Sequence, residues 1–175
     1  MPYNSRLITY TRSGSAFLGH LLSNDERLKI AMGSHNLKTL RDGETLITVI
    51  RNPLDVLASS IINELPTIKD FDDFCHGQIL GYKIFHEKVL SLKNKIIIDF
   101  DKLVGDPFDQ IYKVTVMLGC LDYEMPEYNG VRLESNGHVH SSREHEFYNK
   151  ALDIVKSHDL SYAIALHKEC LKFSI

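Results

Sequence analysis

The sequence predicts an α/β protein, a three-layer fold in which helices flank a short central parallel sheet. Two observations indicate this class. The candidate strands are short and almost continuously apolar, as strands buried on both faces are, and they lie at 7–10, 28–32, 46–50 and 96–100. Between them, apolar residues recur three and four positions apart, which is the spacing of helices that cover such a sheet.

The helices of the first half have local reasons to form. An apolar stripe over 17–22 predicts a helix directly after the first strand. The next helix opens at Asn52 and Pro53, a good N-cap followed by the residue favoured at the first helical position, and runs to about 62. A longer helical pattern covers 71–92.

The second half begins with a helix opening at Asp106 and Pro107, with Gly119 as its candidate C-cap. Residues 121–142 are rich in Gly, Asn, Ser and His and predict a loop. Two further helices are expected, and neither is long or apolar enough to stand alone, so both should pack onto the same domain: 143–157 and 160–172.

Composition is that of an ordinary globular domain. The 175 residues are 43% hydrophobic and 25% charged, so we expect one domain over 1–175. The formal net charge of −3 argues against a broad nucleic-acid surface. No run approaches the roughly 20 apolar residues of a membrane span. Three widely spaced cysteines suggest free thiols, and hence a cytoplasmic protein: Cys75, Cys120 and Cys170.

Small polar residues join the first predicted strand to its helix, in the stretch Thr11-Arg12-Ser13-Gly14-Ser15. Such a turn directs backbone N–H groups into one concavity at the positive end of a helix dipole. Gly14 permits a positive φ, the serines add hydroxyl donors, and Arg12 adds a permanent charge. The stretch therefore predicts an anion-binding loop, with a simple serine-capped helix as the alternative.

A second arginine stands at the end of the third predicted strand. Arg51 follows 46–50, at the strand end where ligands bind in open α/β sheets, and Ser59 lies two turns into the next helix. Taken alone, this pattern favours a surface salt bridge between Arg51 and Asp55.

Taken together, the two stretches resemble the cofactor signatures of the sulfotransferase family, which uses 3′-phosphoadenosine 5′-phosphosulfate (PAPS) and releases 3′-phosphoadenosine 5′-phosphate (PAP). The first is similar to the loop that binds the 5′-phosphosulfate. The second matches Arg-Asn-Pro-x-Asp-x-x-x-Ser, which binds the 3′-phosphate. A third similarity is the late strand at 96–100 followed by a helix opening at Pro107. The resemblance implies a P-loop-like fold, with a cofactor core over about 6–119 and a C-terminal lid loop and helices over 120–175.

The resemblance also implies the cofactor-binding residues: Arg12, Ser13, Gly14, Ser15, Ala16, Phe17, Arg51 and Ser59. Three positions depart from the family's pattern. Thr11 stands in place of a proline, and Ala16 in place of a threonine whose hydroxyl is lost. Phe17 replaces a tryptophan that stacks on adenine, and it is equally consistent with a core position. The family's Gly-rich closing segment is not clear here, and Arg143 is the candidate that reaches the cofactor instead.

The implied reaction is in-line transfer of a sulfuryl group to a hydroxyl or amine of a small-molecule or glycan acceptor, with no metal. Arg12 would stabilise charge on the leaving phosphate, since an arginine cannot realistically donate a proton. His35 follows the second predicted strand in a stretch that resembles the family's Lys-Thr-His-Leu, whose histidine takes the acceptor proton. Glu26 and Glu44 are the nearest carboxylate alternatives for this general base.

We expect acceptor contacts from 63–73 and 121–142. Two other functions stay open. The apolar strand that ends in Asp99 resembles the Mg²⁺-binding strand of P-loop kinases, but the opening loop lacks the Gly-Lys-Ser/Thr that ATP and Mg²⁺ require. A non-catalytic sulfonucleotide-binding module is the other alternative. A metal site is a weaker interpretation of one histidine group: His138, His140 and His145.

Overall fold

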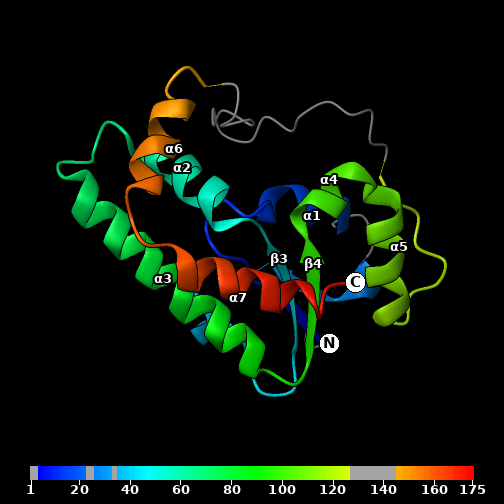
Figure 1. Ribbon diagram of the computed structural model, residues 1–175. Coiled ribbons are helices and arrows are strands. Elements are labelled where there is room, and N and C mark those ends of the chain that lie inside the picture. Colours follow the sequence, from blue (N-terminus) through cyan, green and yellow to red (C-terminus); the bar gives the residue numbers. More distant parts are fainter. Residues whose placement is uncertain (1–3, 23–25, 33–34, 127–144) are drawn as a thin grey trace.

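The computed structural model describes residues 4–22, 26–32, 35–126 and 145–175 (Figure 1). At its centre is a four-stranded sheet in the order β2-β1-β3-β4, in which all neighbouring strands run parallel. The predicted fold class is therefore confirmed. The strands are β1 (Ser5–Leu7), β2 (Ile30–Met32), β3 (Thr45–Ile50) and β4 (Lys95–Asp99).

The first strand differs most from its expected bounds of 7–10. Its ladder pairs Ser5 with Ile30 and Thr45 and ends at Leu7. Ile8 still reaches β3, because its backbone N donates to the carbonyl oxygen of Ile47 at 3.0 Å. Beyond Ile8, the apolar pattern reflects the burial of Tyr10 in the core.

Helices cover both faces of the sheet in two hydrophobic cores (Figure 1). Side chains alternate along β3, so Leu46 and Ile50 enter one core while Ile47 and Val49 enter the other. The first core packs against α2 (Pro53–Glu64), α3 (Phe71–Ser91), α6 (Tyr148–Lys156) and α7 (Ser161–Leu171). The second packs against α1 (Ser15–Leu22), α4 (Phe100–Gly105) and α5 (Pro107–Met117).

The predicted helix signals at Asn52 and Gly119 are confirmed. Asn52 caps α2, since its Oδ1 accepts from the backbone N of Leu54 at 3.0 Å. At the end of α5, Gly119 has a φ of +78° and Cys120 N donates back to the carbonyl of Thr115 at 2.8 Å. This is the Schellman arrangement, in which a left-handed glycine lets the chain leave the helix.

The C-terminal helices begin later than the pattern predicts. Residues 145–147 form a turn in which the N–H of Phe147 donates to Nδ1 of His145 at 3.1 Å, so α6 begins at Tyr148 rather than at 143. Helix α6 packs on α2, and α7 packs on α3. The hydroxyl of Tyr148 donates to Oδ1 of Asp55 at 2.5 Å and ties α6 to the first turn of α2. Most of the predicted loop over 121–142 lies outside the described residues.

Several global expectations can be compared with the described residues. The three cysteines are buried free thiols. Within the described ranges, no helix is both long and apolar enough to cross a membrane.

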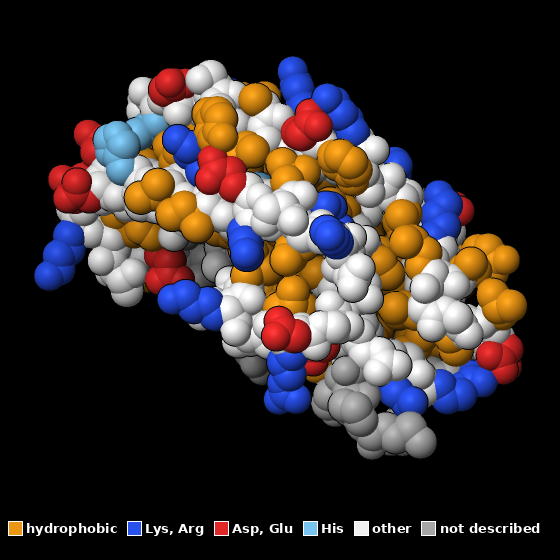
Figure 2. All heavy atoms as spheres, turned by 90° about the horizontal axis from the view of Figure 1, so that it is seen from below, with side chains coloured by type: hydrophobic (Ala, Val, Ile, Leu, Met, Phe, Trp, Pro, Cys, Tyr) orange, Lys and Arg blue, Asp and Glu red, His pale blue; other side chains and the backbone are white. Residues whose placement is uncertain are grey.

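Helix α5 keeps the large apolar side chains of Phe108, Tyr112 and Met117 more than half exposed. Figure 2 shows hydrophobic side chains gathered at its right edge, the side of the molecule on which α5 lies in Figure 1.

Candidate functional site

The predicted site residues follow three neighbouring strands. Strand β1 lies between β2 and β3, and all three run parallel, so their carboxyl ends meet at one edge of the sheet. The segments that follow carry Arg12 after β1, His35 after β2 and Arg51 after β3. Ligands of open α/β sheets bind at such an edge. The sheet order therefore brings together the three segments that the sequence singled out.

The opening loop has an unusual backbone conformation that its neighbours hold in place. Arg12 has a φ of 60°, in the left-handed region that costs a residue with a Cβ about 1–2 kcal/mol. Arg51 donates from Nη1 to the carbonyl oxygen of Arg12 at 3.0 Å. The segment that follows β3 thus binds the backbone of the opening loop.

The side chain of Arg12 makes a second link between the two stretches. Its Nε donates to Oγ of Ser59 at 3.1 Å, and Ser59 is only 2% exposed on α2. Burial lowers the pKa of Arg12 and the carboxylate of Glu64 opposes that shift, so the guanidinium stays charged. In this state it lies beside Ser59, which the sequence assigns to the 3′-phosphate.

Phe100 is a residue of this site that the sequence analysis did not identify. It begins α4 directly after β4, and the guanidinium carbon of Arg51 lies 4.5 Å from the centroid of its ring. The ring also packs against the opening loop, because a Cβ added to Gly14 would lie 2.9 Å from it. An aromatic residue immediately after the last strand was the signal that could have found it.

Gly14 and Ser13 are the loop residues whose backbone conformation and burial bear on the predicted anion binding. Gly14 has a φ of +92°, so glycine is required both by the backbone and by the Phe100 ring. The side chain of Ser13 is fully buried, and within the described part of the chain its Oγ has no hydrogen-bond partner. A buried hydroxyl costs free energy unless it is paired, so a bound oxyanion would satisfy it.

The residues after Ser13 have differing environments. Ser15 begins α1, whose first turn closes with a 3.0 Å bond from Leu18 N to the carbonyl of Gly14. Ala16 is exposed. Phe17 is half-buried and packs against the second hydrophobic core. Its core position fits one of the two roles considered for it, and stacking on adenine stays a prediction.

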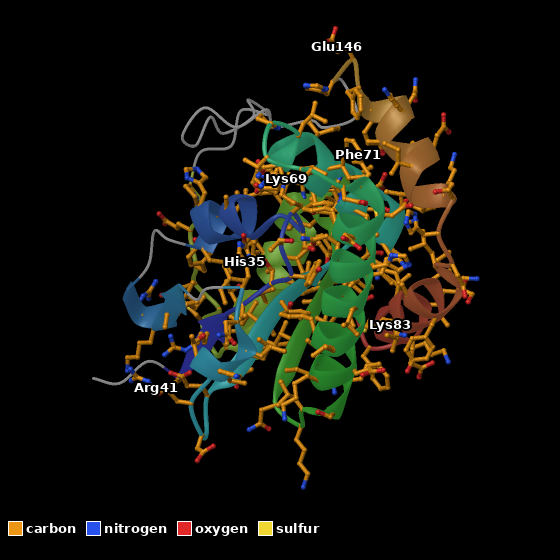
Figure 3. The ribbon with its side chains drawn as sticks, turned by 90° about the vertical axis from the view of Figure 1, so that its left-hand side faces the viewer. His35, Arg41, Lys69, Phe71, Lys83 and Glu146 are labelled. Carbon is orange, nitrogen blue, oxygen red and sulfur yellow. The ribbon has the colours of Figure 1, made fainter. Side chains whose placement is uncertain are left out.

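His35 is tied to the same strand edge. Its Nδ1 lies 2.9 Å from the carbonyl oxygen of Thr9, two residues beyond the end of β1. A carbonyl can only accept, so Nδ1 carries a proton and, in the neutral ring, Nε2 carries the lone pair. The ring is exposed and lies beside α1 in Figure 3. This tautomer can accept a proton at Nε2.

The carboxylates considered as alternatives accept hydrogen bonds from other groups of the protein. Glu44 precedes β3, at the opposite edge from Arg51, and accepts from Arg6 at 2.7 and 2.9 Å. That bond lowers its pKa, which does not suit a base. Asp99 caps α4 by accepting from the backbone N of Asp101 at 3.0 Å. Asp55 accepts from Tyr148.

Some predicted residues cannot be placed. Arg143, His138 and His140 lie outside the described residues, as does the side chain of Glu26. Among the residues that are described, no group of three His, Cys, Asp or Glu side chains could hold a metal ion. The segment 63–73, from which acceptor contacts are predicted, covers the end of α2, the connection to α3 and the start of α3, and Lys69 and Phe71 mark it in Figure 3.

Comparison with known proteins gives one structural similarity. No family model and no curated protein matches the chain. The fold is similar to the crystal structure of mouse sulfotransferase SULT7A1 complexed with PAP, with a TM-score of 0.53 and 16% sequence identity. The similarity covers 91% of this chain, which spans 65% of the length of that sulfotransferase. At this identity it shows that the two chains share an α/β fold with a parallel sheet.

Proposed function

We propose that the chain binds PAPS and transfers its sulfuryl group to a hydroxyl or amine of an acceptor. The observation that carries the proposal is the pair of bonds between the two cofactor stretches: Arg12 to Ser59, and Arg51 to the carbonyl of Arg12. Residues assigned from separate signatures lie in direct contact at the ligand-binding edge of the sheet. The shared fold with a PAP-bound sulfotransferase supports it.

The opening loop would hold the 5′ end of the nucleotide. The buried Oγ of Ser13, the hydroxyl of Ser15 and the N-terminal amides of α1 are the donors that suit an oxyanion. Gly14 leaves room for close approach. Arg51 and Ser59 would hold the 3′-phosphate, with a charged fork from one and a hydroxyl from the other. The residues present therefore fit a nucleotide with phosphates at both positions.

The chemistry would rest on two side chains. The bound cofactor supplies the sulfuryl group and an oxygen on which negative charge develops as the bond breaks. Arg12 would stabilise that charge as a permanent cation with several donors. His35 would take the acceptor proton at Nε2, since Thr9 holds its Nδ1 proton in place. Acceptors would be small molecules or glycans, approaching past 63–73.

A thermal-shift experiment tests this function. PAP without Mg²⁺ should raise the melting temperature of the full chain, while ATP with Mg²⁺ has little effect. A ligand at a hundredfold excess over its dissociation constant stabilises the native state by about 2.7 kcal/mol. Stabilisation by Mg-ATP alone would favour a phosphotransferase that uses Asp99, and would contradict the proposal.

A further inference from the structure

We propose that Tyr82 is a positioning residue that holds Arg51 and thereby sets the preference of the site for a nucleotide carrying a 3′-phosphate. The inference rests on the proposed function and deepens it. Tyr82 lies in the middle of α3 and its side chain is fully buried. Its hydroxyl donates a hydrogen bond of 3.0 Å to the backbone carbonyl of Arg51.

This bond completes the fixation of Arg51. The Arg51 carbonyl lies just beyond β3, and Asn52, the next residue, has already turned to cap α2. At the other end of the residue, the guanidinium lies over the ring of Phe100 and donates to the carbonyl of Arg12. Tyr82 holds the backbone and the other two contacts hold the charge. Arg51 therefore has little conformational freedom at the point where a phosphate would contact it.

Tyr82 is itself held rigidly enough to act as an anchor. Its ring stacks on that of His86, one helical turn later, with centroids 3.8 Å apart and planes 21° from parallel. The rings of Tyr10 and Tyr82 form a T-shaped pair with centroids 5.4 Å apart. Nδ1 of His86 lies 2.7 Å from the Tyr82 carbonyl, so that nitrogen carries a proton. Burial raises the pKa of Tyr82, which keeps its phenol protonated and able to donate.

Helix α3 makes a separate contact with Tyr10, just before the opening loop, which supplies a contrasting variant. The hydroxyl of Tyr10 donates to the carbonyl of Gln78 at 2.8 Å, and Tyr10 lies two residues before Arg12 in the chain. Gly81 leaves room for that hydroxyl, since a Cβ there would lie 3.0 Å from it. Gly81→Ala thus disturbs the contact of α3 with Tyr10, whereas Tyr82→Phe disturbs its contact with Arg51.

The experiment compares two nucleotides in the full chain by calorimetry. PAP carries a 3′-phosphate, and adenosine 5′-monophosphate does not. Removing the hydroxyl in Tyr82→Phe should weaken PAP binding by about threefold to tenfold, which is the range expected for the loss of one hydrogen bond. The same variant should weaken the binding of adenosine monophosphate by less than about twofold. Tyr162→Phe is the matched control, because its exposed hydroxyl donates to Glu87 at 2.8 Å and should leave both affinities unchanged.

Failure of this inference is distinct from failure of the proposed function. A wild-type chain that binds neither nucleotide, or binds both equally, contradicts the proposed function. If the wild type prefers PAP and Tyr82→Phe keeps that preference, or loses its fold by circular dichroism, Tyr82 is structural and the inference is wrong. Gly81→Ala should weaken the binding of both nucleotides by a similar factor.

Discussion

Nε of Arg12 donates a hydrogen bond of 3.1 Å to Oγ of Ser59, joining residues 47 positions apart in the chain. A serine hydroxyl has one proton and two lone pairs, so accepting from Arg12 leaves the proton of Ser59 available to a ligand. The neighbouring arginine also makes the surroundings of that hydroxyl positive. Both effects favour an anion beside Ser59.

Ser59→Ala should weaken PAP binding by about threefold to tenfold, because one hydrogen bond to the 3′-phosphate is lost. Ser60→Ala is the matched control: its buried hydroxyl donates to the carbonyl of Val56 at 2.9 Å, within α2. Arg51→Ala should cost more than tenfold, since a charge-assisted bond to a phosphate contributes about 1.5–3 kcal/mol. Isothermal calorimetry measures all three, and equal losses in Ser59→Ala and Ser60→Ala would contradict the assignment.

Gly14→Ala should destabilise the protein and impair nucleotide binding. The substitution places a side chain at a φ of +92° and brings its Cβ to 2.9 Å from the Phe100 ring. Gly43→Ala separates the two effects, because Gly43 has a φ of +83° and nothing lies within 4 Å of the added Cβ. Backbone strain alone should cost about 1–2 kcal/mol in the free energy of unfolding. Denaturant titration should show a larger loss for Gly14→Ala, and equal losses would mean that the ring moves away freely.

Protonation of His86 should destabilise the protein in mild acid. Burial lowers the pKa of His86 from 6.5 to about 4, so between those values the unfolded chain binds the proton and the native state does not. Stability therefore falls as the pH drops from about 6.5 to about 4, by about 3 kcal/mol in total. His167, which lies close enough to lower the pKa of His86 further, has its own pKa lowered by burial and changes stability in the same direction.

His86→Phe keeps an aromatic ring against Tyr82 and removes this titration. Urea titrations should show that the unfolding free energy falls less between pH 7 and pH 5 in the variant than in the wild type. An unchanged loss would assign the acid sensitivity to other groups, His167 first.

The sequence predicted the sheet and the convergence of the candidate site segments because both depend on local patterns. Apolar runs such as 46–50 identify buried strands, and Asn52 with Pro53 identifies a helix start. Parallel strands place their carboxyl ends together, so motifs after β1 and β3 must converge once both strands exist.

The contacts that organise the site could not be predicted in this way. Tyr82 reaches Arg51 from a helix 31 positions later, and its residue type fits an ordinary core position on α3. Phe100 acts through packing on Gly14 and Arg51, which depends on the distances between elements rather than on any local pattern. The first strand was misplaced for a related reason, since Tyr10 lies beyond the end of the ladder and is apolar because it is buried in the core.

His35→Ala decides between an enzyme and a binding module. Thr9 fixes the proton on Nδ1, so Nε2 is the nitrogen that could take the acceptor proton as the sulfuryl group arrives. Its loss should lower kcat by about 10²–10⁴, while the affinity for PAP stays within about twofold because the proposed cofactor contacts belong to other residues. His76→Ala is the control, an exposed histidine on α3 whose ring packs on that of His158. Turnover on any accepted hydroxyl, measured beside calorimetry with PAP, separates the outcomes. Full turnover in His35→Ala would remove it as the base, and lost PAP binding would make it a cofactor-site residue, because a general base acts on the acceptor and not on the nucleotide.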